Sequence, residues 1–459
     1  MEIRFDNPLH VYFVGIGGIS MSGIAEIILT AGFTVSGSDR VESDLTKGLE
    51  KKGAHIFYDQ SVSHVEKGMD VLVYSAAVAK SNPDREKASE LGITEMSRAE
   101  FMGLLMKNYR IPIGISGTHG KTTTTSMVSE IMMAADEDPT IQNGGILRSI
   151  NSNTRIGGFK YFVFEACEYT NSFHSFFPRI SIILNIEEDH LDFFKDLNDI
   201  RNSFKKFADL LPEDGLLVIN GEIDHFEEIA KDIKCPYLTY GPDDRFDYYP
   251  SDITCDEFGH CSYVCNIKDT KESFMVSLSV TGVHNVYNSL AAIAVADFLG
   301  LDFDDIQKGL IACEGSKRRF EKRGEFNGVT VIDDYAHHPS EIRTTLAAAQ
   351  NYPHKKLWCV FQPHTYTRTK AFLDDFAEVL SMADSVILTD VYPAREKDIY
   401  GCNSTNLYEK LKEKGTECVL ISSFEDIEEF LYKNCINGDL LITVGAGDIV
   451  KIADKMVEK

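Results

Sequence analysis

The segment Gly117-Thr118-His119-Gly120-Lys121-Thr122 has the residue types of a loop that binds phosphate groups. Glycines let backbone N–H groups face phosphate oxygens, and a lysine brings a positive charge to the terminal phosphates. The Thr122 hydroxyl is placed to bind Mg²⁺. Strict Walker spacing requires glycine at position 115, where this chain has isoleucine. The loop nevertheless follows an apolar run and opens a helical pattern, so we expect it to bind ATP and use the terminal phosphoryl group.

A second glycine-rich loop, Gly15-Ile16-Gly17-Gly18-Ile19-Ser20, follows an apolar run near the N-terminus. A tight turn of this kind directs N–H groups and a helix N-terminus toward a diphosphate. The NAD fingerprint G-x-G-x-x-G requires glycine where Ser20 stands, although Asp39 lies where a ribose-binding acid is expected. The loop alone indicates a nucleotide diphosphate. It leaves open an NAD-dependent dehydrogenase and a plain strand-to-helix turn.

Glu165 ends one predicted strand, and His190 comes shortly after another. Because the carboxyl ends of parallel strands meet at one edge of a sheet, both residues are expected beside the phosphate loop. A carboxylate and a neutral imidazole there make a sensible site for a second Mg²⁺. The neighbouring acids are expected to be solvated surface groups instead: Glu168, Glu187, Glu188 and Asp189.

The polar string Gly282-Val283-His284-Asn285-Val286-Tyr287-Asn288 comes directly before an apolar helical stretch, Ser289–Leu299. Glycine, histidine and asparagine at a helix entry supply polar groups that point outward. The alternative, that Asn285 simply caps the helix, stays open.

Two more polar strings follow apolar runs in the last third of the chain. In the first, Val331–Glu341, Asp334 is suited to orient a nucleotide or its metal. His337 in the same string is suited to hold an amine or a carboxylate at reacting distance. A packed or capping role for His338 stays equally open. In the second string, Phe361–Thr369, Arg368 is suited to bind a carboxylate with two parallel hydrogen bonds.

The elements that must position these residues alternate between strand and helix, which predicts parallel α/β sheets. One such system starts at 11–14, a second at 111–116 and a third near 328–333. We place domain boundaries near residues 108 and 315, which divides the chain into domains 1–108, 109–315 and 316–459. A length of 459 residues is also what about three domains would need.

Composition excludes several classes of protein. The formal net charge of −25 argues against general binding to nucleic acid or to anionic membranes. No apolar run approaches the ~20 residues of a membrane helix, and we see no signal peptide. Ten cysteines in a chain of this length do not indicate a disulfide scaffold. The group Cys255, Cys261 and Cys265 around His260 lacks zinc-site spacing, so reduced thiols are expected there.

Taken in order, these motifs resemble those of the Mur ligase family, whose members join amino acids to carboxylates using ATP. The resemblance rests on the two glycine loops, on Lys317-Arg318-Arg319-Phe320-Glu321 and on the strings that contain His337-His338-Pro339 and Phe361-Gln362-Pro363-His364. It covers essentially the whole chain. It implies an α/β protein with an N-terminal Rossmann-like UDP-sugar domain, a central P-loop ATPase-type domain and a C-terminal Rossmann-like domain.

The resemblance also implies a role for each matching residue. ATP is expected to contact Gly117, Thr118, His119, Gly120, Lys121, Thr122, Thr123, His284, Asn285 and Asn288. The UDP-sugar is expected to contact Gly15, Ile16, Gly17, Gly18, Ser38, Asp39 and Ser75. Metal ligation falls to Thr122, Glu165 and His190, amino-acid binding to Arg368 and His337, and catalysis to Lys121, Arg319, Asp334 and His337. Arg319 is expected to reach the γ-phosphate, and Arg318 to be a surface charge.

The activity implied is ligation of L-alanine to UDP-N-acetylmuramate through an acyl phosphate, a step of peptidoglycan synthesis that supports cell shape and division. ATP and two Mg²⁺ ions are the expected cofactors. The protein is expected to be cytoplasmic, as a monomer or homodimer, with no nucleic-acid partner and no membrane insertion. Another amide ligase of the same fold, using a different amino acid or a peptide, is the alternative. An NAD-dependent dehydrogenase is much less favoured, because Ser20 and the intact phosphate loop speak against it.

Overall fold

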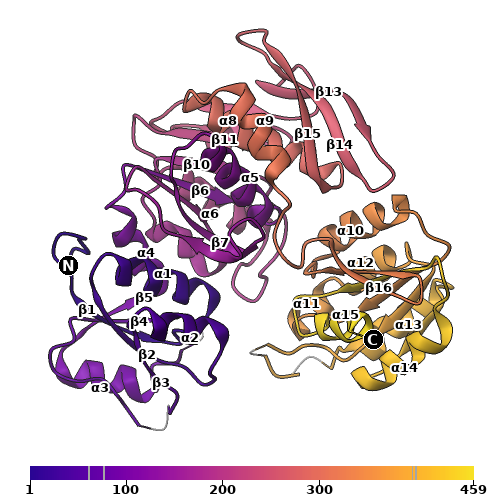
Figure 1. Ribbon diagram of the computed structural model, residues 1–459, viewed down its shortest axis with the longest axis horizontal. Helices are drawn as coiled ribbons and strands as arrows, with labels where there is room; N and C mark the ends of the chain where they lie inside the picture. The colour runs from indigo at the N-terminus through magenta and orange to yellow at the C-terminus, as the bar shows by residue number, and fades with distance from the viewer. Residues whose placement is uncertain (60–61, 76–77, 395, 399–400, 459) are drawn as a thin grey trace. The chain divides into compact units, whose positions relative to one another are not determined.

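The computed structural model describes residues 1–59, 62–75, 78–394, 396–398 and 401–458. Its strands form three sheets, which confirms the predicted α/β class (Figure 1). The chain divides into two compact units. Unit 1 comprises Met1–Ile186, Arg201–Tyr249 and Ser289–Ala312, and unit 2 comprises Glu187–Ile200, Pro250–Asn288 and Cys313–Lys459. No helix within the described residues is long and apolar enough to cross a membrane.

The first sheet is parallel, with strand order β3-β2-β1-β4-β5. Its elements are β1 (His10–Val14), α1 (Ile19–Thr30), β2 (Thr34–Ser38), α2 (Asp44–Lys51), β3 (His55–Phe57), β4 (Val71–Tyr74), α3 (Pro83–Leu91), β5 (Thr94–Ser97) and α4 (Arg98–Met106). β1 is almost wholly buried, as expected of a parallel strand covered on both faces. Val14 pairs with Ser38 and Tyr74, so the segments after β1, β2 and β4 start at the same edge.

The second sheet has the order β15-β14-β13-β12-β11-β10-β6-β9-β7-β8. Its first part contains β6 (Ile111–Ser116), α5 (Lys121–Ala134), β7 (Thr140–Leu147), β8 (Ser152–Arg155), β9 (Tyr161–Glu165), the short 3₁₀ segment η1 (Tyr169–Ser175), β10 (Ile180–Ile183) and α6 (Leu197–Ala208). β11 (Leu216–Asn220), α7 (Phe226–Ala230) and β12 (Tyr237–Tyr240) follow. β6 pairs in parallel with both β9 and β10, bringing Glu165 opposite Ile115 and Ile183 opposite Ser116. One edge of the sheet therefore carries the start of the phosphate loop, Glu165 and the start of the segment after β10.

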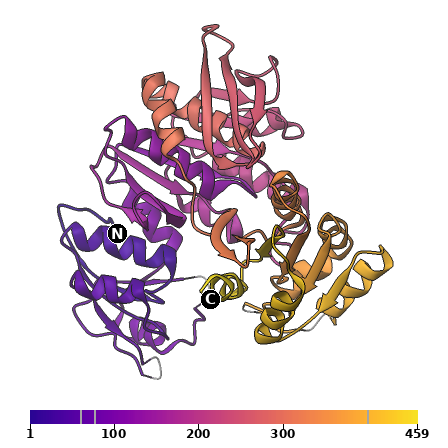
Figure 2. The ribbon, with the colours of Figure 1, turned by 45° about the vertical axis from the view of Figure 1, so that its right-hand side comes forward.

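Strands β13 (Tyr248–Cys255), β14 (His260–Ile267) and β15 (Ser273–Thr281) complete this sheet, and Figure 2 shows them as long arrows in salmon. Along β14 buried and half-buried residues alternate, as they do in a strand with one covered face. Cys255 and Cys261 form a disulfide across the β13–β14 turn, so the expectation of reduced thiols is wrong for this pair. The short loop between two antiparallel strands brings the two side chains together. Cys265 is a free, buried thiol, as expected.

Helices α8 (His284–Phe298) and α9 (Phe303–Ala312) precede the third sheet, whose strand order is β16-β17-β21-β18-β19-β20. The elements are β16 (Glu321–Phe326), β17 (Val329–Asp334), α10 (Pro339–Asn351), β18 (Leu357–Phe361), α11 (Tyr366–Ala371), α12 (Leu373–Leu380), β19 (Ser385–Leu388), α13 (Ser404–Glu413), β20 (Cys418–Leu420), α14 (Phe424–Asn434), β21 (Leu440–Val444) and α15 (Val450–Val457). One apolar cluster packs the sheet against α10, α12 and α13, and another packs it against α14 and α15. Val444 pairs with Asp334 and Phe361, so the polar strings after β17 and β18 begin at a common edge.

Candidate active site

The phosphate loop of unit 1 needs glycine at two positions. Gly117 has φ +143° and Gly120 has φ +82°, conformations that other residues rarely adopt. A Cβ at Gly117 would also lie 2.9 Å from the Cβ of Leu184. Gly120 then caps the N-terminus of α5 without a side-chain hydrogen bond. This is the strand–loop–helix geometry in which helix N–H groups are available to an anion.

Lys121 lies inside this loop and is paired with a buried acid. Its ammonium donates to the carbonyl oxygens of Gly117 and Thr118 and to Oε2 of Glu168 at 3.0 Å. Burial alone would lower the pKa of Lys121, but the carboxylate of Glu168 outweighs it and raises that pKa above its usual value. Glu168 is only 3% exposed. It is therefore not a solvated surface acid, and the sequence-based expectation for it is wrong.

Asn185, just beyond β10, holds the loop from the other side. Its side-chain oxygen accepts from the N–H of His119 at 2.8 Å, and its amide donates back to the carbonyl of His119 at 3.1 Å. Its own carbonyl accepts from the N–H of Thr118. Sequence reasoning did not single out this residue. The available signal was a polar residue directly after the apolar run Ile180–Leu184.

Glu165 and Thr122 supply the oxygen atoms that a hard cation prefers. Glu165 is half-buried at the end of β9, and its Oε1 accepts from the N–H of Gly144 at 2.7 Å. Thr122 lies in the first turn of α5, 8% exposed. Glu165 is also close enough to Lys121 to contribute to its raised pKa. His190, the third expected ligand, belongs to unit 2.

The first glycine loop is held by the strands on either side of it. The N–H groups of Gly15 and Ile16 donate to the carbonyl of Ser38, and the N–H of Gly17 donates to Oδ2 of Asp39 at 2.7 Å. A Cβ on Gly15 would lie 3.8 Å from the Ser75 hydroxyl. The register thus brings together five predicted UDP-sugar residues, and with them Asp39, whose carboxylate already accepts from one loop N–H.

Ser38 is anchored by its side chain as well as by its backbone. Its side chain is fully buried and donates to Oδ2 of Asp84 at 2.7 Å. The buried Asp84 also accepts from Tyr12 and from the N–H of His64. The Ser38 hydroxyl is therefore committed to the domain interior. Ser38 holds the loop through its carbonyl, and its predicted contact with the UDP-sugar stays a prediction.

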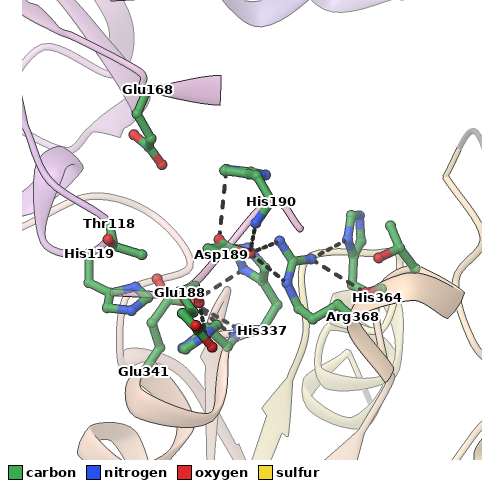
Figure 3. Close-up of polar contacts among 12 residues, drawn as sticks. Thr118, His119, Glu168, Glu188, Asp189, His190, His337, Glu341, His364 and Arg368 are labelled. Atoms are coloured by element: carbon green, nitrogen blue, oxygen red, sulfur yellow. Dashed lines mark hydrogen bonds and ion pairs between the residues drawn. The ribbon is translucent and has the colours of Figure 1, made fainter. Parts of the chain in front are cut away.

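Unit 2 contains a pocket that brings together both residues predicted to bind the amino acid. It is lined by Asp189, His190, Leu191, Asp192, Tyr335, His337, His364, Thr365, Thr367, Arg368, Ala371, Phe372, Glu396 and Ala446. Nε and Nη2 of Arg368 donate to Oδ1 of Asp189 at 3.2 and 2.9 Å, and Nη1 lies 3.3 Å from Nδ1 of His364 (Figure 3). The guanidinium is thus held in the wall of the pocket by an internal carboxylate.

Asp189 is buried and not solvated, so its expected exposure is also wrong. Burial alone would raise the pKa of Asp189, but Arg368 and the nearby imidazoles lower it well below its usual value. Glu187 is half-buried and accepts from the hydroxyl of Ser340 at 2.6 Å, which corrects the expectation for this residue as well. Glu188 is exposed, as expected.

His337 is a neutral imidazole in this pocket. Burial lowers its pKa to about 4, against the raising effect of Glu341. Nδ1 lies 3.0 Å from the carbonyl oxygen of Tyr335. Since a carbonyl only accepts, Nδ1 must carry the proton there, which leaves Nε2 as an acceptor. Next in the string, His338 caps α10, and its Nε2 contacts the carbonyl of Glu188, which settles the capping alternative.

Helix α11, which carries Arg368, is held at its N-terminus by Glu396. The carboxylate of Glu396 accepts from the N–H of Thr367 at 2.9 Å and from its hydroxyl. Thr365, the residue before the helix, has φ +66°, a rare conformation for a β-branched residue. Its N–H donates to the carbonyl of Tyr392 at 2.9 Å. Tyr392 and Glu396 thus hold the start of α11, the helix whose orientation sets where the Arg368 side chain points.

Asp334 and Arg318 organise the backbone before β16. Asp334 is buried, its pKa is raised to about 6 by that burial, and its oxygens accept from the N–H groups of Phe320 and Ala336. Arg318 donates to Oδ2 of Asp333 at 2.9 Å and to the carbonyls of Gly445 and Gly447. Arg318 is therefore a structural residue and not a surface charge, contrary to expectation.

The remaining candidates of unit 2 lie around the start of α8. Asn285 and Asn288 are buried and hydrogen-bonded to each other at 2.8 Å. Asn285 also donates to the carbonyl of Thr281. His284 is exposed and within electrostatic reach of Arg319, whose guanidinium lies 5.5 Å from the ring centre of Tyr335.

Comparison with known proteins shows which family the chain belongs to. Residues 10–110 match the model described as Mur ligase family, catalytic domain, residues 115–296 match the Mur ligase middle domain, and residues 318–447 match the Mur ligase, glutamate ligase domain. The chain belongs to the Mur ligase family. Members of this family depend on ATP, in keeping with the geometry of the loop at Lys121.

Individual relatives show which Mur ligases this chain is similar to over its full length. The chain is 54% identical, over 100% of both sequences, to the UDP-N-acetylmuramate–L-alanine ligase of Agathobacter rectalis. A crystal structure of UDP-N-acetylmuramate–alanine ligase from Thermotoga maritima matches with a TM-score of 0.82 at 29% identity, covering 98% of each chain. A murein peptide ligase structure from Psychrobacter arcticus matches with a TM-score of 0.74 at 26% identity and the same coverage.

Proposed function

We propose that this Mur ligase joins L-alanine to UDP-N-acetylmuramate at the expense of ATP, in the synthesis of peptidoglycan precursors. The observation that carries the proposal is the full-length 54% identity to a ligase of that name. The residues support it, because one chain provides a phosphate loop with Lys121 and a pocket with a carboxylate-binding Arg368.

The chemistry proposed has two steps. An oxygen of the lactyl carboxylate attacks the γ-phosphorus of ATP, and ADP leaves, which gives an acyl phosphate. The amine of L-alanine then attacks the carbonyl carbon and loses a proton, and phosphate leaves. Lys121 stabilises the charge on the transferred phosphoryl group. Arg368 holds the alanine carboxylate away from the acyl phosphate, so that the amine faces it.

Residue roles that depend on bound nucleotide follow the resemblance to the family. We propose that His284, Asn285, Asn288 and Arg319 contact ATP, and that Asp334 contributes by holding the backbone at Phe320. The residues proposed for the UDP-sugar are Gly15, Ile16, Gly17, Gly18, Ser38, Asp39 and Ser75. The domain limits 108 and 315, a cytoplasmic location and a monomer or homodimer remain predictions.

Two Mg²⁺ ions are proposed as cofactors, with Thr122, Glu165 and His190 as protein ligands. When bound, Mg²⁺ neutralises phosphate charge. The hydroxyl of Thr122 and the carboxylate of Glu165 fit a hard cation, which prefers oxygen ligands, and His190 is proposed as the third ligand from the resemblance to the family. Glu165→Ala and His190→Ala should each lower activity by on the order of 10²-fold, more than they weaken ATP binding. Full activity of either variant at low Mg²⁺ would remove that residue from the metal site.

The experiment that tests the function is release of phosphate from ATP in the presence of each substrate alone and of both. We expect release only when UDP-N-acetylmuramate and L-alanine are present together. A panel containing L-alanine, glycine, L-serine and a tripeptide then tests the amino-acid assignment. Release that requires the tripeptide would replace L-alanine ligation with peptide ligation. Release without any amino acid would contradict both.

A further inference from the structure

The two carboxylate oxygens of Asp189 have different surroundings. Oδ1 accepts three hydrogen bonds, two from Arg368 and one from the N–H of His190 at 2.7 Å. Oδ2 accepts none from the described residues, and Nε2 of His190 is 3.7 Å away. The Asp189 side chain is 9% exposed and lines the pocket of unit 2. One oxygen of this largely buried carboxylate therefore has no donor among the described residues and belongs to a residue that lines a cavity, where a ligand can supply one.

The charges around this pocket also favour a ligand that carries a positive group. Among its described lining residues, Arg368 is the one lysine or arginine, and it faces three acids: Asp189, Asp192 and Glu396. The Glu396 carboxylate is committed to Thr367. Arg368 can bind a ligand carboxylate, but a ligand carrying only a carboxylate would add to the excess of acids over cations in this lining. A zwitterion carries one charge of each sign and adds no net charge.

We propose that Asp189 binds the α-ammonium group of the amino-acid substrate through Oδ2, while Arg368 binds its carboxylate. The inference rests on the proposed function. The ion pair between the two side chains keeps both charges compensated, which a buried pair requires. The incoming zwitterion then meets an acceptor and a donor already fixed in place. Nε2 of His337, in the same pocket, is a second acceptor for an N–H of the substrate.

This arrangement predicts selection for the amino group itself. L-Lactate has the methyl group and carboxylate of L-alanine but a hydroxyl in place of the ammonium. It should bind Arg368 and gain nothing from Asp189. Wild-type enzyme should therefore show an inhibition constant for L-lactate about 10- to 100-fold above the KM for L-alanine, the worth of one hydrogen bond to a charged group.

The test compares Asp189→Asn with Glu188→Gln, which removes the same charge from an exposed neighbour in the same loop. KM for L-alanine and the competitive inhibition constant of L-lactate are measured for both. We expect Asp189→Asn to raise the KM for L-alanine about 10- to 100-fold, with L-lactate inhibition changed less than about threefold. Glu188→Gln should leave both constants as in the wild type.

Equal weakening of L-alanine and L-lactate would show that Asp189 only positions Arg368, and would overturn the proposal. So would an unchanged KM for L-alanine. If Asp189→Asn does not fold, the wild-type comparison decides, because L-lactate binding as tightly as L-alanine contradicts an ammonium site. Failure of the proposed function looks different, since the wild type would then release no phosphate in response to L-alanine.

Discussion

The protein holds two buried cations against acids in different ways. In unit 1, Lys121 is bonded to Glu168 and to two carbonyls of its own loop. In unit 2, Arg368 is bonded to one oxygen of Asp189 and approaches His364. Both acids are buried; Glu168 raises the pKa of Lys121, and Arg368 lowers the pKa of Asp189.

The difference lies in what remains available to a ligand. Phosphate oxygens that approach Lys121 must displace one of its three acceptors, Glu168 or a loop carbonyl, because the ammonium has only three protons and all are engaged. The guanidinium of Arg368 has five N–H donors, of which two hold Asp189 while Nη1 faces Nδ1 and the carbonyl of His364. The second N–H of Nη2 and the open oxygen of Asp189 can therefore meet a zwitterion while the pair persists. A point charge suits transfer of a phosphoryl group, and a planar fork suits orientation of a small amino acid.

Lys121→Ala should have the largest effect. Without the ammonium, phosphate release should fall by on the order of 10³-fold, since positioning and charge stabilisation carry phosphoryl transfer. UDP-sugar affinity, measured by calorimetry, should be nearly unchanged, because the first glycine loop is built from different strands. Loss of both affinities together would contradict separate nucleotide sites.

Arg368→Lys should raise the KM for L-alanine about 10- to 100-fold and change the KM for ATP little. Lysine keeps the charge but cannot form two parallel bonds to a carboxylate. Arg343→Lys is the matched control, because Arg343 lies on the exposed face of α10 and pairs with Glu378. Steady-state titration of L-alanine separates the outcomes, and an unchanged KM would remove Arg368 from the pocket.

Glu168→Gln should lower the thermal stability of the protein, because it breaks the ion pair with Lys121 and leaves the Arg368–Asp189 pair intact. It leaves the buried Lys121 without its counter-charge, so the melting temperature of the ligand-free enzyme should fall by several degrees. Added Mg²⁺-ATP restores a negative charge at Lys121 and should give a larger thermal shift than in the wild type. Glu227→Gln, an exposed acid of unit 1, serves as control. An equal ATP-induced shift in both variants would show that Glu168 does not neutralise Lys121.

Glu396→Ala should have a smaller effect on the amino-acid pocket. It removes the carboxylate that caps α11, a contact typically worth ~1 kcal/mol, so the KM for L-alanine should rise about fivefold. Glu378→Ala is the control, because Glu378 is an exposed acid of unit 2 that pairs with Arg343. A loss as large as that of Arg368→Lys would mean that Glu396 contacts the amino acid directly.

His337 should produce no pH effect in the physiological range. Its pKa is lowered to about 4, so the imidazole stays neutral from pH 7.5 down to about 5.5. The KM for L-alanine should be flat over that range as far as this residue is concerned. Because the unfolded chain binds a proton near pH 6.5 and the folded one does not, His337 lowers stability as the pH falls from 6.5 toward 4. A rise in KM centred near pH 6.5 that disappears in His337→Gln would contradict the lowered pKa.

Local pattern was enough to find the cations and the edges of the sheets. The G-T-x-G-K-T loop, the strand ahead of it and Arg368 after β18 are continuous stretches of chain, and their spacing carries the information. The three α/β systems follow from alternating apolar runs and helical patterns for the same reason.

Only the tertiary structure decided which acids matter. Glu168, Glu188 and Asp189 look alike in sequence, since each is a carboxylate in a polar stretch after a strand. Burial and the approach of Lys121 or Arg368 distinguish them, and Arg368 comes from a segment 179 residues beyond Asp189. The same holds for Asn185 and for the Cys255–Cys261 bond. Chain periodicity reports local conformation, whereas a charge partner distant in sequence is selected by the packing of the whole fold.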